Sequence, residues 1–203
     1  MTGEHYFSET PSSGGTRRPV EFAVGGRDYR LSVAGGVFSA GRLDQGTGVL
    51  LRKAPLPGPD EPGPLLDLGC GYGPIACVLA DRAATATVYA VDVNSRAREL
   101  TAANASTLGV ADRLRVCAPD DVPDDVAFRQ IWSNPPIRIG KDGLHELLLR
   151  WLPRLTPDGV AWLVVARHLG ADSLQEWLAG RGFVAERQAS QKGFRVLRVT
   201  AAD

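Results

Sequence analysis

The chain has no long apolar segment. Among its 203 residues, no uninterrupted apolar run comes near the roughly 20 residues that a helix needs to cross a bilayer. Residues 1–19, MTGEHYFSETPSSGGTRRP, are polar and lack the apolar stretch that a secretory signal requires. Both absences argue against a membrane protein or a secreted one, and we predict a cytoplasmic protein.

Cysteine is scarce as well. The chain has 3 cysteines, Cys70, Cys77 and Cys117, and none of them belongs to a Cys-x-x-Cys pair. An odd number without that spacing argues against a disulfide framework and predicts reduced thiols. The 3 histidines share no spacing typical of metal ligands, so we predict that the protein binds no metal.

There is no excess of charge of either sign. The sequence has 23 basic and 23 acidic residues, and its formal net charge is zero. Nucleic-acid-binding domains usually carry a basic excess, so the overall charge does not indicate such a partner, although a local basic patch is enough for a compact target. At this length, and with 44% hydrophobic residues, the chain can bury a core without disulfides, and we predict one main domain.

The N-terminal part of the chain, residues 1–60, is predicted to pack on the main domain as a small extension. It starts with a polar arm. Two alternating runs at 20–33 surround a Gly-Gly pair, which indicates a β-hairpin. A loop then leads to a short helix that begins near Thr47, and a proline-rich connector follows at 54–64.

The main domain, residues 61–203, alternates between strand-like and helical patterns. The strand-like runs are at 65–69, 86–93, 114–119, 128–133, 159–167, 183–188 and 194–199, and helical patterns are at 74–83, 95–109, 143–155 and 171–182. Such alternation predicts an α/β fold with a doubly wound parallel sheet. No helix separates the last two runs, which predicts an antiparallel hairpin at one edge of that sheet.

The segment DLGCGYG at 67–73 joins the first strand of the main domain to its helix. Gly69, Gly71 and Gly73 allow a tight turn and the close approach of a ligand, and the N-terminus of the next helix presents unpaired N–H groups. A plain strand-to-helix turn is the alternative. The dinucleotide pattern G-x-G-x-x-G is not met, because Pro74 stands where its third glycine belongs.

Three acidic residues indicate which ligand this loop binds. Asp67 stands just before the glycines, where it would repel a pyrophosphate but suit an ammonium group. Asp92 ends the next strand, 19 residues past Gly73, and is placed to accept both hydroxyls of a ribose. Asp120 ends the third strand and could meet an adenine amino group. Ammonium, ribose and adenine together describe S-adenosylmethionine, which we predict as the cofactor in preference to a nicotinamide dinucleotide.

The order of these motifs resembles that of class I methyltransferases. The resemblance rests on DLGCGYG, AVDVN, Asp120 and NPP. It implies a Rossmann-like fold with a seven-stranded, mostly parallel sheet and an antiparallel edge strand. The chain is similar to the "methyltransferase small domain" group, which includes the small-subunit ribosomal RNA guanine-N2 methyltransferases. The segments similar to that group are HYFSETPSS (5–13), GVFSAGRLDQGT (36–47), SNPPIRIGK (133–141) and GFRVLR (193–198).

Bacterial members of the ribosomal group typically carry a second, non-catalytic N-terminal domain. The single copy in this sequence is more similar to the short, archaeal-type relatives. The resemblance to the group as a whole implies an S-adenosylmethionine-dependent methyltransferase, and its ribosomal members imply an RNA substrate.

The segment IWSNPPIRIGK at 131–141 ends a strand-like run on an amide followed by two prolines. A strand-end turn is the plainest interpretation. In a methyltransferase, however, the side-chain oxygen of Asn134 and the carbonyl of Pro135 could both accept hydrogen bonds from an amine and turn its lone pair toward the methyl group. The prolines fix the backbone before the substrate arrives. We predict that Asn134, Pro135 and Pro136 are catalytic and that Asn134 also borders the cofactor.

The resemblance also implies where the substrate binds. Relatives often have an aromatic residue after NPP, but Ile137 stands there. Contact with the target base is therefore predicted either from Phe38 or from the apolar side chain of Ile137. Arg138 and Lys141 could hold the phosphates that flank a flipped nucleotide, and a solvated charged loop is the alternative. The candidates for outer contacts are Arg17, Arg18 and Arg42.

The predicted reaction is methyl transfer to guanine N2 of small-subunit (16S) ribosomal RNA, by a monomer that binds this RNA or the small ribosomal subunit. A tRNA base, a protein glutamine amide or a small metabolite are alternative substrates, and a module that binds the cofactor without catalysis is the alternative function. Thr47 is predicted to cap its helix or to bind the methionine carboxylate.

Overall fold

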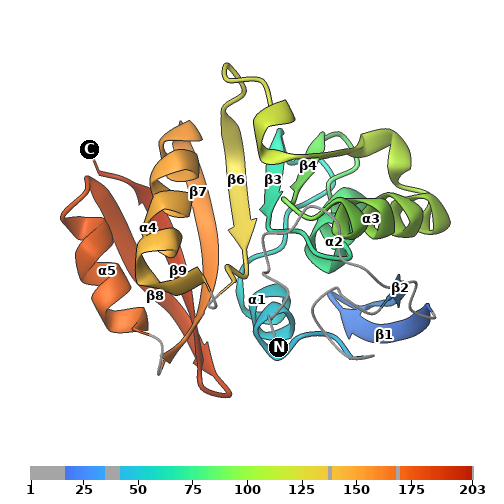
Figure 1. The fold of residues 1–203 in the computed structure, drawn as a ribbon, viewed down its shortest axis with the longest axis horizontal. Helices are drawn as coiled ribbons and strands as arrows, with labels where there is room; N and C mark the ends of the chain where they lie inside the picture. The colour runs from blue at the N-terminus through green and yellow to red at the C-terminus, as the bar shows by residue number, and fades with distance from the viewer. Residues whose placement is uncertain (1–16, 35–41, 137–138, 168–169, 203) are drawn as a thin grey trace, which may run out of the picture.

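The computed structural model describes residues 17–34, 42–136, 139–167 and 170–202 (Figure 1). The candidate substrate residues Phe38, Ile137 and Arg138 lie outside the described residues. Within these ranges, strands form two separate sheets, one of two strands and one of seven. None of the helices within these ranges is long and apolar enough to span a membrane.

The small sheet is the predicted β-hairpin. Strands β1 (Arg18–Val24) and β2 (Arg27–Val33) pair antiparallel across two glycines with positive φ, as a two-residue turn requires. The hairpin is attached to two helices of the main domain. Tyr29 donates a hydrogen bond of 2.8 Å to Asp81. The side chain of Asn104 accepts a hydrogen bond of 2.7 Å from the N–H of Ser32 in β2 and donates one of 2.9 Å to the carbonyl of the same residue.

The large sheet has the strand order β5-β4-β3-β6-β7-β9-β8. All neighbours pair in parallel from β5 to β7, and β9 pairs antiparallel with both β7 and β8. The predicted closing hairpin is therefore confirmed, and the reversed strand lies one position inside the edge. The strands are β3 (Leu65–Leu68), β4 (Val88–Val91), β5 (Leu114–Cys117), β6 (Phe128–Ser133), β7 (Leu155–Ala166), β8 (Phe183–Gln191) and β9 (Phe194–Ala201).

Helices cover both faces of the large sheet (Figure 1). On one face, α1 (Gln45–Lys53), α2 (Pro74–Arg82) and α3 (Ser95–Leu108) share a core with the hairpin. On the other face, α4 (Gly140–Trp151) and α5 (Ala171–Ala179) pack on a second core. The central strand β3 is buried along its whole length, as expected of a parallel strand between two helical layers.

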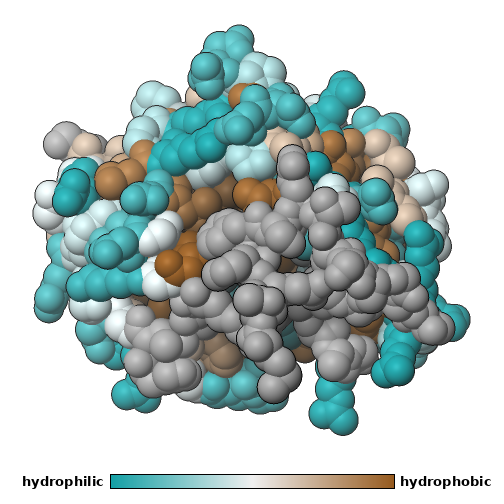
Figure 2. All heavy atoms as spheres, in the orientation of Figure 1, coloured by the Kyte–Doolittle hydropathy of each residue, from teal (hydrophilic) through white to brown (hydrophobic). Residues whose placement is uncertain are grey.

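The parallel strands decide where a ligand can bind. In a parallel sheet all carboxyl ends lie at one edge, so the segments that follow β3, β4 and β6 meet there although they are far apart in the sequence. In Figure 1, α1 lies beside the carboxyl end of β6. In the orientation of Figure 1, much of the outline of the molecular surface is hydrophilic, and apolar groups are visible near its middle (Figure 2).

Gly73, which precedes α2, provides a test of this packing. Its φ is +88°, and a Cβ built on it would lie 2.8 Å from Cγ2 of Thr101 on α3. Gly109 is a matched control, because its φ is +77° and a Cβ there would meet nothing within 4 Å. We expect Gly109→Ala to lower the free energy of unfolding by about 1 kcal/mol, through its left-handed backbone alone.

We expect Gly73→Ala to cost about 1–3 kcal/mol more than the control, because the packed helices must also move apart. Urea unfolding of both variants measures the difference. Equal losses of unfolding free energy in the two variants would show that Thr101 and α3 can shift away from the added Cβ without a loss of stability.

Candidate functional site

The glycine loop between β3 and α2 presents bare backbone at the carboxyl edge of the sheet. Gly69 and Gly71 have φ values of +78° and +58°, which favour glycine. A Cβ on Gly71 would meet nothing within 4 Å, and one on Gly69 would come no closer than 4.0 Å to Cδ of Pro136. The loop therefore has open space in front of it and lies beside the Asn-Pro-Pro segment.

Asp67 lies inside β3 and has no exposed surface. Its Oδ2 accepts a hydrogen bond of 2.8 Å from the backbone N–H of Ala76, so it fixes the first turn of α2 on the strand. Its Oδ1 is buried and has no hydrogen-bond partner among the described residues. Burial raises the pKa of Asp67 to about 8, the N–H of Ala76 opposes that rise, and the charge of Asp92 adds to it.

Asp92 follows β4 and is only 5% exposed. Its Oδ2 accepts from the N–H of Gly71 and its Oδ1 from the N–H of Asn94, both at 2.9 Å. Burial raises the pKa of Asp92, and these two N–H groups oppose the rise. The carboxylate thus joins the glycine loop to the start of α3, and each of its oxygens retains capacity for a further donor.

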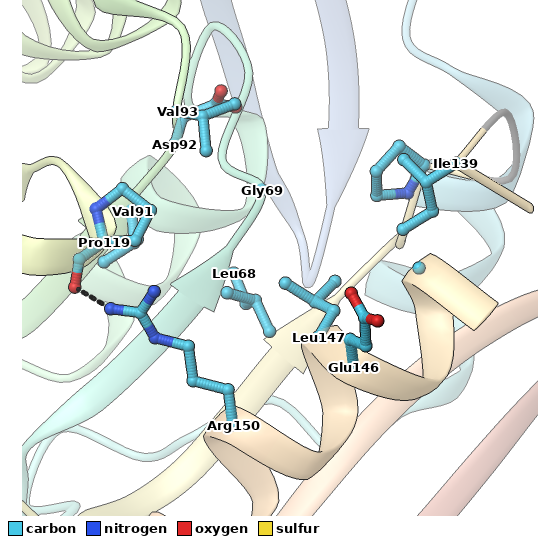
Figure 3. Close-up of a pocket in the computed structure, with 12 residues that line it drawn as sticks. Leu68, Gly69, Val91, Asp92, Val93, Pro119, Ile139, Glu146, Leu147 and Arg150 are labelled. Atoms are coloured by element: carbon cyan, nitrogen blue, oxygen red, sulfur yellow. Dashed lines mark hydrogen bonds between the residues drawn. The ribbon is translucent and has the colours of Figure 1, made fainter. Parts of the chain in front are cut away.

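These loops surround a cavity of about 300 Å³, called the first cavity (Figure 3). It brings together three predicted site residues, Gly69, Asp92 and Pro136. Glu146, Leu147 and Arg150 reach it from α4, and Arg150 donates a hydrogen bond of 2.9 Å to the carbonyl of Pro119 at its rim. The other lining residues are mostly apolar: Leu68, Val91, Val93, Pro119, Ile139 and Gly143.

The predicted position of Asp120 is wrong. Strand β5 ends at Cys117, and Asp120 lies beyond it in a short 3-10 helix, Pro119–Asp121. Its side chain is 89% exposed and forms an ion pair of 2.7 Å with Arg150. Its neighbour Pro119 lines the first cavity instead, because the chain turns after Cys117 and directs the acid outward.

Asn134 follows β6 and is half-buried. Its Nδ2 donates to Oδ1 of Asp44 at 2.6 Å and to Oγ1 of Thr47 at 3.0 Å. The preceding residue, Ser133, donates to the carbonyl of Leu68 at 2.7 Å, which holds the end of β6 against β3. The position of Asn134 is therefore fixed both by the sheet and by the segment before α1.

The start of α1 differs from its prediction. The helix begins at Gln45, and its N-cap is Asp44, whose Oδ1 accepts from the N–H of Thr47 at 2.9 Å. Thr47 lies inside the first turn and is the capped residue, not the cap. An aspartate three residues before Thr47 is an N-cap signal that the sequence contains, and Asp44 is the site residue that the pattern analysis missed.

A second cavity, of about 320 Å³, lies between α4, β7 and the start of α5. Pro135 and Lys141 both line it, so the structure brings these two predicted residues together. Pro135 lines the second cavity and Pro136 the first, which places the Asn-Pro-Pro segment between the two. The other lining residues are Gly140, Leu144, His145, Val164, Val165, Gly170, Ser173 and Leu174.

The remaining predicted contacts, Arg17, Arg18 and Arg42, are exposed. Arg17 and Arg18 lie at the start of the hairpin, and Arg42 lies two residues before the N-cap of α1. None of the three lines either cavity.

Comparison with known proteins gives matches over most of the chain. The family model "Methyltransferase small domain" matches residues 28–198. The chain is 32% identical over 198 residues to the uncharacterized protein YbxB of Bacillus subtilis (strain 168), a match that covers 96% of this chain and 97% of the relative. It is also 31% identical over 184 residues to the ribosomal RNA small subunit methyltransferase C of Acinetobacter baumannii (strain AYE), covering 88% of this chain.

That second match covers 53% of the relative, so the chain spans about half the length of this curated methyltransferase. Among solved structures, a 16S rRNA N2 methyltransferase (RsmC) of T. Thermophilus, in complex with AdoMet and guanosine, has a similar fold. Its TM-score is 0.71 at 22% identity, and the match covers 96% of this chain and 52% of that one. The likeness confirms the predicted Rossmann-like methyltransferase fold.

The raised pKa of Asp67 predicts how stability depends on pH. Its carboxyl has a pKa of about 8 in the folded protein against 3.8 in a model peptide, so the folded state binds more protons between these values. Stability should therefore fall as pH rises from about 4 to 8. We expect the melting temperature of the wild type to fall more than that of Asp67→Asn, which cannot ionise, over this interval.

Thermal unfolding of both proteins without ligand, at several pH values, measures this difference. Acids remote from the site contribute equally to both curves, so the difference reports on position 67 together with its coupling to Asp92. Parallel curves would mean that Asp67 is ionised in the folded protein.

Proposed function

We propose that this chain, which belongs to the methyltransferase small domain family, transfers a methyl group from S-adenosylmethionine to an exocyclic amine. The proposed amine is N2 of a guanine in small-subunit ribosomal RNA. The observation that carries the proposal is the place of Asn134, Pro135 and Pro136 between two cavities. A transfer reaction needs the donor on one side of such a segment and the acceptor on the other.

The first cavity has the features that a nucleoside with an attached amino acid requires. Asp92 offers carboxylate oxygens beside apolar walls, which suits the two hydroxyls of a ribose against a flat base. Gly69 and Gly71 have no side chain to obstruct the rest of the ligand. Oδ1 of Asp67, buried behind the glycine loop, has no hydrogen-bond partner among the described residues and is the acceptor proposed for the ammonium group.

S-adenosylmethionine would supply an electrophilic methyl group: the amine nitrogen forms the new N–C bond, the S–C bond breaks, S-adenosylhomocysteine leaves, and the methylated nitrogen loses a proton to water. The chain must supply acceptors for the amine. The lone pair of an aromatic amine is delocalised, so the amine reacts poorly until hydrogen bonds hold its N–H groups. The oxygen of Asn134 and the carbonyl of Pro135 are the proposed pair. Both are fixed before binding, since Pro135 is buried and Asn134 is held at its nitrogen, and preorganised groups of this kind contribute about a hundredfold each to the rate.

Three observations support a ribosomal RNA substrate. The relative from Acinetobacter baumannii is a ribosomal RNA methyltransferase, and the structure from T. Thermophilus was solved with guanosine. Lys141 is exposed at the second cavity, where a cation could hold a phosphate next to a flipped base. The partner is then the small ribosomal subunit or its RNA, which the protein meets as a monomer in the cytoplasm.

Asp92 is the residue to change for cofactor binding. Asp92→Asn keeps one side-chain oxygen for the glycine loop and removes the negative charge. We expect the dissociation constant of S-adenosylmethionine to rise about tenfold or more, because hydrogen bonds to charged groups contribute about 1.5–3 kcal/mol. Calorimetry measures it. Asp112→Asn is a matched control, since that side chain is 70% exposed and pairs with Arg113 away from the first cavity. Unchanged affinity in Asp92→Asn would exclude Asp92 from the cofactor site.

The substrate is identified with S-adenosylmethionine that carries a labelled methyl group. Separate reactions contain small ribosomal subunits, naked 16S ribosomal RNA, tRNA or total protein. We expect label in N2-methylguanosine of the ribosomal RNA, found by nucleoside analysis. Label in tRNA, in glutamine or in a small molecule would replace the proposed substrate, and no label in any reaction would contradict methyl transfer itself.

The same assay tests Asn134. We expect Asn134→Ala to lower the turnover number about a hundredfold, because one of the two amine acceptors is lost, and to leave the affinity for S-adenosylmethionine within about threefold. Turnover equal to that of the wild type would show that the amine is held by other groups.

A further inference from the structure

We propose that Asp44 is a positioning residue that fixes the side-chain amide of Asn134, so that its oxygen faces the reacting amine. The proposal rests on the proposed function and adds to it the device that keeps one acceptor in place. Asp44 and Asn134 are 90 residues apart in the sequence and meet only through the fold.

The two ends of an asparagine amide have nearly the same shape, so the side chain can turn over and exchange its oxygen with its nitrogen. A carboxylate removes this ambiguity because it only accepts hydrogen bonds. Nδ2 of Asn134 lies 2.6 Å from Oδ1 of Asp44, within the range of a short, charge-assisted hydrogen bond. The turned-over amide would place its oxygen against that carboxylate oxygen and lose the bond.

Asp44 is itself held in place. Its Oδ1 accepts a hydrogen bond of 2.9 Å from the backbone N–H of Thr47, and the same oxygen accepts the bond from Nδ2 of Asn134. Oγ1 of Thr47 accepts a second bond from Nδ2 at 3.0 Å. The first turn of α1 therefore provides two acceptors for the amide nitrogen. An acidic side chain is also favoured at the start of a helix by the helix dipole.

The oxygen of Asn134 remains open to a further donor. Among the residues that the structure describes, no group donates a hydrogen bond to it. Gly46 lies close to it, because a Cβ on Gly46 would come within 3.1 Å of that oxygen and of Oδ1 of Asp44, so a larger residue there would crowd both atoms. The carboxylate bound to the amide nitrogen also polarises the amide, which makes the oxygen a stronger acceptor for the amine.

Asp44 has a second role as the N-cap of α1, so the test must separate the two. In Asp44→Ser, the hydroxyl can still cap the helix, because serine is among the preferred N-cap residues. It is one bond shorter than the carboxylate and no longer reaches Asn134. In Asp44→Asn, the side-chain oxygen can still accept from both Thr47 and Asn134, which makes this variant the conservative control.

We expect Asp44→Ser to lower the turnover number about tenfold or more, with an unchanged KM for RNA, an unchanged melting temperature and an affinity for S-adenosylmethionine within about threefold. Asp44→Asn should restore turnover to within about threefold of the wild type. Wild-type turnover in Asp44→Ser would overturn the proposal. So would equal losses in the two variants, because only one of them retains the oxygen.

A second measurement is independent of activity and so separates this proposal from the proposed function. In 15N-labelled protein of 21.7 kDa, the side-chain amide signal of Asn134 is assigned by its absence in Asn134→Ala. We expect one of its protons to be shifted downfield in the wild type by the bond to Asp44, and to return upfield in Asp44→Ser. If no substrate accepts a methyl group, the proposed function fails and this signal still decides the orientation; a signal unmoved in Asp44→Ser overturns the inference.

Discussion

The parallel pairing of β3 with its two neighbours is the constraint on which the rest of the site depends. Backbone hydrogen bonds align β3 with β4 on one side and β6 on the other, so that three segments leave the sheet at the same edge. One segment is the glycine loop, the second starts with Asp92, and the third is Asn134 with its prolines. A shift of one residue in either pairing would turn these side chains to the opposite face and separate them.

The site buries two acidic side chains that receive few hydrogen bonds from the chain itself. Asp67 and Asp92 are both buried beside the same loop, and their hydrogen-bond donors within the loop region are backbone N–H groups. Burial raises the pKa of both, so each would gain from a ligand that brings a positive charge or hydroxyl donors. This arrangement favours a cationic nucleoside over an anionic one and explains why a loop rich in glycine does not serve a pyrophosphate.

The segment before the central sheet contributes to the site as well as to stability. The hairpin is attached to α2 and α3 through Asp81 and Asn104, and the start of α1 contacts the Asn-Pro-Pro segment through Asp44 and Thr47. A plain strand-end turn needs no carboxylate on its asparagine. The contact therefore supports a functional interpretation of Asn134, in which its orientation matters as much as its presence.

The sequence by itself determined the α/β class, the glycine loop, the hairpin and the order of the strands along the chain, because periodicity and glycine spacing are local properties. It also predicted the cofactor and the family. Only the tertiary structure decided that Asp67 is buried behind the loop, that Asp120 turns outward to Arg150, and that Asp44 rather than Thr47 caps α1. Neither the direction of a side chain beyond a strand end nor a contact across 90 residues has a local signature, since both depend on how helices pack against the finished sheet.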